Sequence, residues 1–597
     1  MEKLSLLFKI TNFPIIWIQK HLNRRQFFIL SGIAVGLTSG FAAIMLKMAV
    51  HYIHSLLSAN YFSNIHNLIF VCSPLVGIVL TVIVVKYFFK GKLGRGISNI
   101  LYEIAQKSSF VHKDKMYSHL LTSAITIGFG GSAGLESPIV VTGSAIGSNY
   151  GKTFVLSYKE RTVLLAAGAA AGIAAVFNAP IAGIMFAIEI LLPEIVVGEM
   201  IPIIIASVSG ALCSKIILKE DILFFFKLQQ NFNYYNVPFY IGLGFFSGFL
   251  SLYYSKITHK IEHIFEKHKS TVFSKAIIGG LILGILCFLF PPLFGEGYSS
   301  IKLLAEGRAS EIINNSSFEF LKSSPFFLIL FIGLIMLIKV VATSITLASG
   351  GNGGNFAPSL FVGAFSGFFF SKTINSLNFS LPESNFTIVG MSGILSGVMH
   401  APLTAIFLIA EITGGYELMI PLMIVSSLSF AISRHFEPHS MDTKKLASKG
   451  LIFTANKDKN ILLQINISNL IDKDILTLEP DTSLRKLVHL VQYHNKSIFA
   501  IVTKDNVFKG IVTLDAVREI MFNERLYDKT IMKNIMKYPK RTINIEDDIS
   551  TILKKFDECH EWNLPVIDNK QYVGFISKSK IHIEYRAQLI NQIGAYE

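Results

Sequence analysis

Charged residues are scarce in this sequence of 597 residues, where Asp, Glu, Lys and Arg together make up 16% of the positions. Soluble chains carry roughly 25%. Hydrophobic residues account for 51%. Several charge-free stretches approach or exceed the roughly 20 residues of a bilayer span, namely 26–46, 67–85, 116–135, 162–188, 340–371 and 384–410. The composition therefore excludes an ordinary soluble protein and predicts a polytopic membrane protein.

Cysteine is equally rare, with four residues scattered along the chain at Cys72, Cys213, Cys287 and Cys559. Their separations fit neither a disulfide framework nor a metal site. The net charge is +14, but no basic stripe interleaved with aromatic residues points to nucleic acid. Basic loops and tails beside an anionic leaflet account for the charge. We therefore expect no metal and no nucleic-acid partner.

The two ends of the chain differ from its centre. Residues 1–25 contain five Lys or Arg against one acidic residue, and a long apolar stretch without a cleavage pattern follows. We expect no signal peptide, and the positive-inside rule puts the N-terminus in the cytoplasm. After about residue 432 the sequence becomes mixed polar and apolar, long enough for a separate soluble domain. This pattern predicts a multi-pass protein of the cell membrane with a cytoplasmic tail.

The membrane half contains an internal repeat. Residues 134–138 read GLESP and residues 354–358 read GNFAP, two G-x-x-x-P turns in glycine-rich surroundings. Residues 178–189 read NAPIAGIMFAIE and residues 400–411 read HAPLTAIFLIAE, each with a glutamate nine residues after its proline. We infer two related halves whose helices are interrupted by Gly and Pro, which is typical of a transport site near the membrane midplane. The spacing leaves open whether the halves are parallel or inverted.

Each of these motifs predicts the start of a helix. Proline suits the first turn, where its missing N–H costs nothing, and glycine lets the backbone turn sharply before it. A helix N-terminus offers unpaired N–H groups and roughly half a positive charge. Four such ends are therefore expected to hold a small anion without a lysine or arginine nearby. A full positive charge would hold the anion too tightly for conduction.

Glu136, in GLESP, is the only charged residue between Lys115 and Lys152. An ionisable residue inside a membrane is expensive and marks a functional site by default. At a helix start its carboxylate can occupy the anion's place and leave it on protonation or displacement. The alternative is that Glu136 only caps the helix, but its isolation favours a gate. Glu189 and Glu411, at the ends of the other motif pair, are expected to be structural.

Over residues 25–450 the sequence resembles the CLC family of chloride channels and proton-coupled chloride antiporters. The family's pore motifs G-S-G-I-P, G-[RK]-E-G-P and G-x-F-x-P correspond to GRGIS at 94–98, GLESP and GNFAP. FNAPIAGIMFAIE and HAPLTAIFLIAEITGGYELMIP are similar to the family's helix starts. The resemblance implies an inverted-repeat membrane domain of many short, tilted and broken helices. It also implies a homodimer with one pore per subunit.

The resemblance also assigns roles to single residues. Glu136 corresponds to the gating glutamate. The anion-binding positions implied are Gly134, Leu135, Pro138, Gly354, Asn355, Phe356, Ala357, Arg95 and Asp442.

Three positions depart from the family pattern. The central serine of the family falls at Arg95, with Ser98 in place of the following proline, and its anion-contacting tyrosine falls at about Asp442. We interpret Arg95 and Asp442 as a pair across the inner mouth that forms a gate or a latch; the alternative places both in cytoplasmic loops. The proton-transfer glutamate of antiporters follows a first glutamate, and here the pair is Glu189–Ile190. Ile190 at this coupling position favours passive conduction, with antiport as the alternative.

The tail resembles a tandem pair of CBS domains, each with a β-α-β pattern. Such pairs bind adenosine nucleotides in some relatives, through an aspartate three residues after a Thr or Ser. From Thr513 that position is Ala516, with Asp515 adjacent, and from Ser577 it is Lys580. Thr513 and Asp515 are the candidate nucleotide contacts, but the replacements favour a dimerisation or scaffolding role without a cofactor.

Together these patterns predict a polytopic α-helical membrane protein followed by a small α+β tail. The predicted domains are a transmembrane anion-transport domain at 1–445, a linker at 446–465, and CBS domains at 466–526 and 531–590. We expect a transporter of chloride or a similar small anion rather than an enzyme. The expected partners are the anion, the lipid bilayer, a second copy of the chain and, in the antiporter alternative, protons.

Two functions of other classes fit the sequence less well. An intramembrane zinc protease needs His-Glu-x-x-His, and the nearest match, His560–Glu561, has Leu564 where the second histidine belongs. A CBS-regulated divalent-cation channel needs clustered carboxylates. The carboxylates of the membrane motifs are isolated in sequence, which argues against it.

Overall fold

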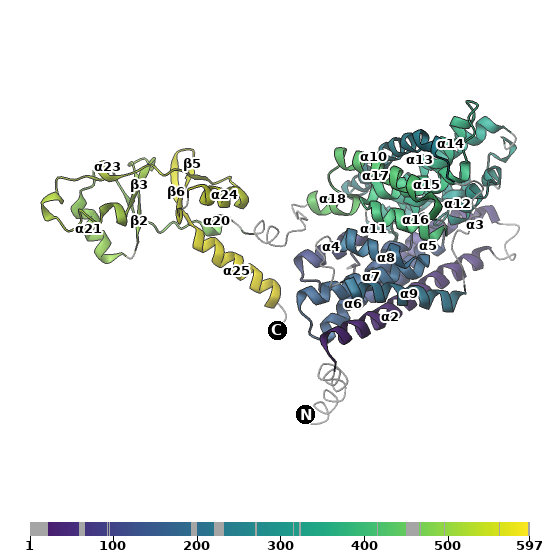
Figure 1. Cartoon of the computed structure of the whole chain (residues 1–597), viewed down its shortest axis with the longest axis horizontal. Helices are drawn as coiled ribbons and strands as arrows, with labels where there is room; N and C mark the ends of the chain where they lie inside the picture. The colour runs from purple at the N-terminus through teal and green to yellow at the C-terminus, as the bar shows by residue number, and fades with distance from the viewer. Residues whose placement is uncertain are drawn as a thin grey trace, which may run out of the picture. The chain divides into compact units, whose positions relative to one another are not determined.

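The computed structural model divides the chain after residue 453 into two compact units, called here the membrane unit and the tail (Figure 1). The described residues are 22–58, 66–91, 93–94, 96–192, 200–219, 232–268, 271–314, 316–321, 324–414, 416–448, 465, 467–494, 496–559 and 561–594. Most of the predicted linker, 446–465, lies outside these ranges. Each unit is described by itself.

The membrane unit is helical throughout its described part, as predicted. Seven of its described helical segments are long and apolar enough to cross a membrane, and others are as short as the seven residues of α8. The helices are α2 (Arg24–Ser58), α3 (His66–Tyr87), α4 (Gly96–Gln106), α5 (Ser118–Gly128), α6 (Glu136–Thr153), α7 (Tyr158–Phe177), α8 (Pro180–Phe186), α9 (Met200–Leu218), α10 (Val237–Lys267), α11 (Val272–Leu289), α12 (Tyr298–Ala305), α13 (Pro325–Ala348), α14 (Phe356–Asn375), α15 (Glu383–Met399), α16 (Pro402–Ile412), α17 (Met419–Phe436) and α18 (Met441–Ser448).

The sequence repeat reappears in the backbone. Helices α7 and α15 both end at a residue in the left-handed conformation, Asn178 with φ 54° and His400 with φ 56°, and a short proline-led helix follows each. The two equivalent loops before α6 and α14 meet in an antiparallel bridge. There Gly134 N–H donates to the Gly354 carbonyl at 2.9 Å, and Gly354 N–H donates to the Gly134 carbonyl at 2.8 Å. Equivalent glycines of the two halves therefore pair reciprocally with each other.

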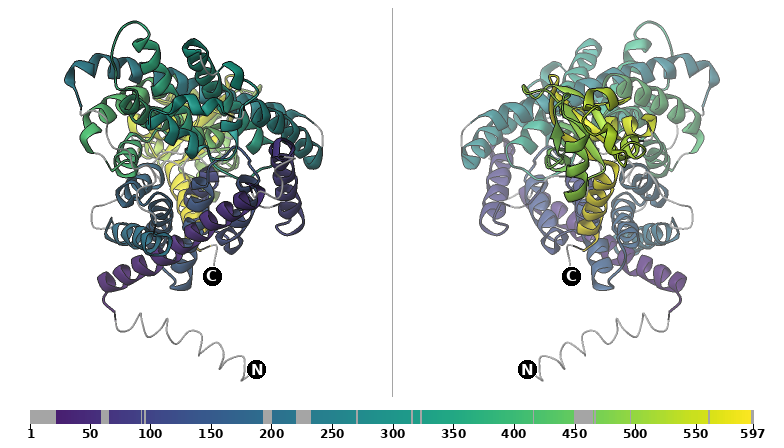
Figure 2. Two further views of the ribbon diagram at one scale, coloured as in Figure 1. Left: turned by 90° about the vertical axis from the view of Figure 1, so that its right-hand side faces the viewer. Right: turned by 90° about the vertical axis from the view of Figure 1, so that its left-hand side faces the viewer.

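Helix α2 lies along one edge of the membrane unit (Figure 2) and packs closely on α9. Three glycines at four-residue spacing make this contact, because added Cβ atoms would collide with the facing helix. Gly32, Gly36 and Gly40 face Pro202, Ala206 and Gly210. Small residues at this spacing are how apolar helices approach each other in a membrane, where burial of apolar surface gives no driving force.

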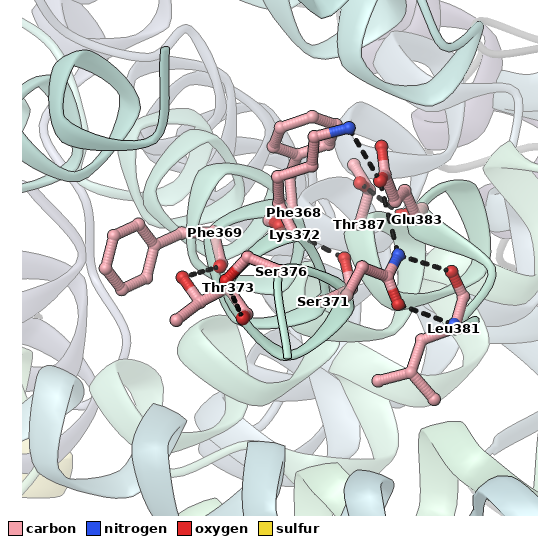
Figure 3. A network of polar contacts seen from close by, with 10 residues as sticks. Phe368, Phe369, Ser371, Lys372, Thr373, Ser376, Leu381, Glu383 and Thr387 are labelled. Atoms are coloured by element: carbon pink, nitrogen blue, oxygen red, sulfur yellow. Dashed lines mark hydrogen bonds and ion pairs between the residues drawn. The ribbon is translucent and has the colours of Figure 1, made fainter. Parts of the chain in front are cut away.

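Polar contacts close the connection between α14 and α15 (Figure 3). The Lys372 ammonium lies 3.0 Å from the Glu383 carboxylate at the first residue of α15. The Asn375 amide donates to the Leu381 carbonyl at 3.0 Å and its oxygen accepts from the Leu381 N–H at 2.6 Å. These contacts fix the far end of α14, whose other end forms half of the candidate site.

The tail contains two similar β-α-β units, which confirms the tandem pattern seen in the sequence. The first sheet has the order β1-β2-β3 and the second β4-β5-β6, each with one parallel and one antiparallel pair. The elements are α20 (Ile467–Leu470), β1 (Thr477–Leu478), α21 (Leu484–Tyr493), β2 (Ile498–Val502), β3 (Phe508–Thr513), α22 (Leu514–Val517), α23 (Met532–Ile535), β4 (Ile543–Asn544), α24 (Ile549–Cys559), β5 (Asn563–Asp568), β6 (Gln571–Ser577) and α25 (Lys578–Gly594).

Candidate functional site

The first turns of α6 and α14 face each other across the Gly134–Gly354 bridge. Leu135 and Asn355 stand directly before these helices, and neither caps its helix with a side-chain hydrogen bond. The N–H groups of both first turns are therefore not taken up by the caps. GLESP and GNFAP thus deliver two helix N-termini to one place, as predicted. Pro138 lies in the first turn of α6, where the missing N–H costs no hydrogen bond.

The Glu136 side chain occupies the space between these two helix ends. It is 1% exposed. Its Oε1 accepts a hydrogen bond from the Tyr298 hydroxyl at 2.7 Å, and its Oε2 accepts from the Ala357 N–H at 3.4 Å. A carboxylate of α6 therefore sits at the N-terminus of α14, where a bound anion would find the same donor. Tyr298 was not anticipated from the sequence.

Phe356, the first residue of α14, is buried beside this point. Its ring lies 5.8 Å from the Phe177 ring and 6.5 Å from the Phe186 ring, measured between centroids. The Tyr254 hydroxyl donates to the Asn355 side-chain oxygen at 3.3 Å. Aromatic packing and this hydrogen bond hold the start of α14 in place.

The other two predicted anion-binding helix ends already carry carboxylates. Ile181 N–H and Ala182 N–H, at the start of α8, donate to Glu411 at 3.0 and 2.8 Å. Leu403 N–H and Thr404 N–H, at the start of α16, donate to Glu189 at 3.1 and 2.8 Å. The expectation that four helix ends hold the anion is therefore wrong, because each half supplies the glutamate that caps the other half's short helix. The starts of α6 and α14 are not capped by either of these two glutamates.

Removing one of these caps is expected to destabilise the membrane unit. In Glu411→Gln the amide nitrogen cannot accept a hydrogen bond, so one of the two N–H groups at the start of α8 loses its acceptor and the other keeps only an uncharged oxygen. The expected cost is about 1–3 kcal/mol. Thermal unfolding of the purified protein in detergent measures this cost. Glu417→Gln is the matched control, because Glu417 is exposed and lies five residues beyond the end of α16, the helix that carries Glu411. Equal unfolding temperatures for the two variants would contradict the capping role.

A small cavity of about 60 Å³ adjoins the start of α14 on the side of α18, and is called here the α18-side cavity. Its lining includes Ser98, Ser137, Phe356 and Asp442. A water needs roughly 15 Å³ by this measure, so the cavity admits a small ion with little of its water. The Ser98 hydroxyl donates to Asp442 at 3.4 Å. Arg95, the other member of the predicted pair, lies outside the described residues.

A second cavity, of about 250 Å³, adjoins the first and also contains Asp442. Glu189 and Ile190 line it together with His400, Arg434 and His439. Ile190 thus presents an apolar side chain at the coupling position named from the sequence. Arg434 and the carboxylates of Glu189 and Asp442 put charges of both signs in the same wall.

A third cavity lies against α12 and is called the α12-side cavity; Figure 1 shows α18 at the left edge of the membrane unit and α12 in its right half. Its lining joins Lys47, His51 and His54 of α2 to Leu135, Glu296 and Tyr298. The sequence signal at Glu296 is weaker than that at Glu136. A charge-free run, 276–295, precedes Glu296, but Lys302 follows six residues later.

Lys339 corrects the expectation that no buried cation lies near the motifs. It is 0% exposed, and its Nζ donates to the carbonyls of Leu293 at 3.2 Å and Gly295 at 2.9 Å. The ammonium also lies 4.8 Å from the centre of the Phe361 ring. The cation therefore holds the segment before Tyr298 rather than an anion. It too stands alone in the sequence, between charge-free runs at 323–338 and 340–371.

In the tail, the two candidate nucleotide contacts are engaged locally. The Thr513 hydroxyl oxygen accepts from the Ala516 N–H at 3.4 Å and so caps α22. Asp515 is exposed and lies 2.6 Å from Arg518 in an ion pair. Both residues are thus placed at the start of one short helix.

These features define a class: a multi-pass membrane protein with an internal repeat that brings two broken-helix starts together around a buried carboxylate. The family model described as "Voltage gated chloride channel" matches residues 76–434, and the CBS domain model matches 467–523 and 532–584. Since the first match spans more than half of the chain, the protein belongs to the voltage-gated chloride channel family. This confirms the resemblance to CLC proteins and to CBS domains. The family comprises channels and transporters, and its members are multi-pass membrane proteins.

Named relatives are identical to this chain at about a quarter of the aligned positions. "Chloride channel protein CLC-e" of Arabidopsis thaliana is 28% identical over 452 residues, which are 67% of this chain and 62% of that protein. "Voltage-gated ClC-type chloride channel ClcB" of Escherichia coli O81 (strain ED1a) is 28% identical over 320 residues, 53% of this chain and 71% of that protein. A solved structure of "a slow cyanobacterial Cl-/H+ antiporter" has a TM-score of 0.62 at 23% identity, and the match covers 72% of this chain and 98% of that one. The last likeness shows that the fold is shared.

Proposed function

We propose that this protein carries chloride, or a similar small anion, passively across the membrane past the starts of α6 and α14, with Glu136 as the gate. One observation carries the proposal. The Glu136 carboxylate, itself an anion, accepts the Ala357 N–H at the first turn of α14. A permeating anion and this carboxylate compete for the same donor, so the path conducts when Glu136 leaves.

The proposed anion site is made of main-chain groups at both helix starts. It consists of Gly134, Leu135, Pro138, Gly354, Asn355, Phe356 and Ala357, with Asp442 in the lining of the α18-side cavity. Binding by N–H groups and helix ends is weak enough to be exchangeable, which conduction requires. Chloride is proposed because the printed names of the relatives specify it. The Arg95–Asp442 pair stays a prediction.

Passive movement is proposed because Ile190 cannot bind a proton at the coupling position. Proton-coupled antiport is the second candidate, and a specific observation favours it: the similar solved structure is that of a Cl−/H+ antiporter. In that case Glu136 would bind the proton at one end of the proton path, and a group other than Ile190 would bind it at the other end.

We also propose the location, oligomeric state and topology that the sequence predicts. We place the protein in the cell membrane as a homodimer with one pathway per chain, and its basic N-terminus and tail in the cytoplasm. We propose a scaffolding role for the CBS pair without an adenosine nucleotide, because Ala516 and Lys580 stand where the ribose-binding aspartates belong.

The test is a simultaneous record of chloride and protons in liposomes that contain the purified protein and an outward chloride gradient. We expect chloride to leave without uphill proton movement, and protein-free liposomes to release none. Chloride-driven uphill proton movement would select the antiporter instead. Absence of chloride movement in correctly folded protein would contradict the proposed function.

A further inference from the structure

A second carboxylate, Glu296, stands at the same helix start as Glu136. It is half-buried in the wall of the α12-side cavity, which has a volume of about 330 Å³. Its Oε1 accepts from the N–H of Leu135 at 3.4 Å, and Leu135 is the residue directly before Glu136. The two carboxylates therefore lie one behind the other, as seen from the α12-side cavity. Glu296 faces the cavity, and Glu136, 1% exposed, lies behind it.

One short segment holds both contacts to this helix start. Glu296 reaches Leu135, and Tyr298, two residues later, donates to Glu136 at 2.7 Å. The segment is anchored from the protein interior by Lys339, whose Nζ donates to the carbonyls of Leu293 and Gly295. The position of Glu296 is thus fixed by the fold and is not that of a loose surface side chain.

The charges around Glu296 come from every element packed against it. Helix α2 contributes Lys47, His51 and His54, α6 contributes Glu136, α12 contributes Tyr298 and α13 contributes Lys339. Glu136 has a hydrogen-bond donor at each oxygen, the Tyr298 hydroxyl and the Ala357 N–H, and these two donors stabilise its ionised form. Two ionised carboxylates at one helix start repel each other, so the arrangement favours one proton for the pair, carried by Glu296.

We propose that Glu296 supplies the proton that opens the Glu136 gate. The O–H bond of the Glu296 carboxyl breaks and an O–H bond forms on the Glu136 carboxylate, which leaves Glu296 ionised and Glu136 neutral. A neutral Glu136 no longer competes with an anion for the Ala357 N–H. Glu296 then takes up a new proton from a hydronium ion in the α12-side cavity. This inference rests on the proposed gate at Glu136 and names the group that controls it.

The experiment measures chloride flux from liposomes over a series of pH values, equal on both sides so that the orientation of the protein does not matter. We expect flux through the wild-type protein to rise by up to about tenfold per pH unit on acidification, as one proton is taken up. Glu296→Gln should flatten this profile, and Glu296→Asp, which keeps a titrating group, should retain part of it. Glu306→Gln, at the exposed ion pairs beyond the end of α12, is the matched control and should follow the wild type.

Several outcomes would overturn the proposal. One is a Glu296→Gln profile with the wild-type slope, and another is a flat profile in a His51→Gln/His54→Gln double variant, which would identify the histidines as the sensor. Loss of flux at every pH in both Glu296 variants would show a structural role. Glu136→Gln distinguishes failure of the proposed gate from failure of the proposed proton donor. If Glu136→Gln flattens the pH profile while Glu296→Gln does not, only the role of Glu296 is contradicted. If Glu136→Gln keeps the wild-type profile, the gate itself fails.

Discussion

Replacement of Glu136 by glutamine is expected to raise chloride flux through the reconstituted protein several-fold and to remove its dependence on pH. The amide has no charge, so it competes poorly with an anion for the helix end. A charge at a partly buried helix terminus is stabilised by up to about 2 kcal/mol. Loss of this stabilisation shifts the competition between the side chain at position 136 and a chloride ion by up to about 30-fold in favour of chloride. Initial chloride efflux from liposomes, normalised to the amount of folded protein, measures the change.

Tyr298→Phe gives a graded control for the same gate. It removes the hydroxyl that donates to Glu136 at 2.7 Å but leaves the carboxylate and its charge. Flux should rise less than in Glu136→Gln and should stay pH-dependent. Equal flux in the wild type and Glu136→Gln at all pH values would show that the carboxylate seen between α6 and α14 does not block the path.

The helix starts and the repeat could be predicted because they depend on local rules. Gly and Pro at fixed positions in GLESP and GNFAP determine a turn followed by a helix, and the fold places both at one point. The isolation of Glu136 in a neutral run had the same predictive value, since a lone intramembrane charge needs a reason. The strands of the tail followed in the same way from short apolar runs between turns.

The partners of these residues could not be predicted, because they come from distant parts of the chain. Glu411 caps a helix start 229 and 230 positions away, and Tyr298 lies 162 positions from Glu136. No local pattern contains that information. Lys339 is different: it is isolated between two long charge-free runs, so the argument used for Glu136 selects it as well, whereas Glu296 has such a run only before it.

A single methyl group at Gly367 is expected to prevent stable folding of the membrane unit. The Cβ atom of an alanine there would collide with the carbonyl group of Phe386, and at Gly147, in the other half, with that of Leu164. Neither obstacle is a flexible side chain, so α14 must separate from α15, or α6 from α7. Ordinary overpacking costs about 1–3 kcal/mol, and we expect Gly367→Ala to reach or exceed the upper value.

Gly242→Ala is the matched control, because it makes the same change within a helix of the same unit. Its Cβ would meet only the end of the Phe370 ring, at 3.1 Å, and alanine favours a helix over glycine by about 1 kcal/mol. Thermal unfolding in detergent should therefore show a small gain for Gly242→Ala and a large loss, or no folded protein, for Gly367→Ala. Equal stability would mean that the two helices can separate without cost.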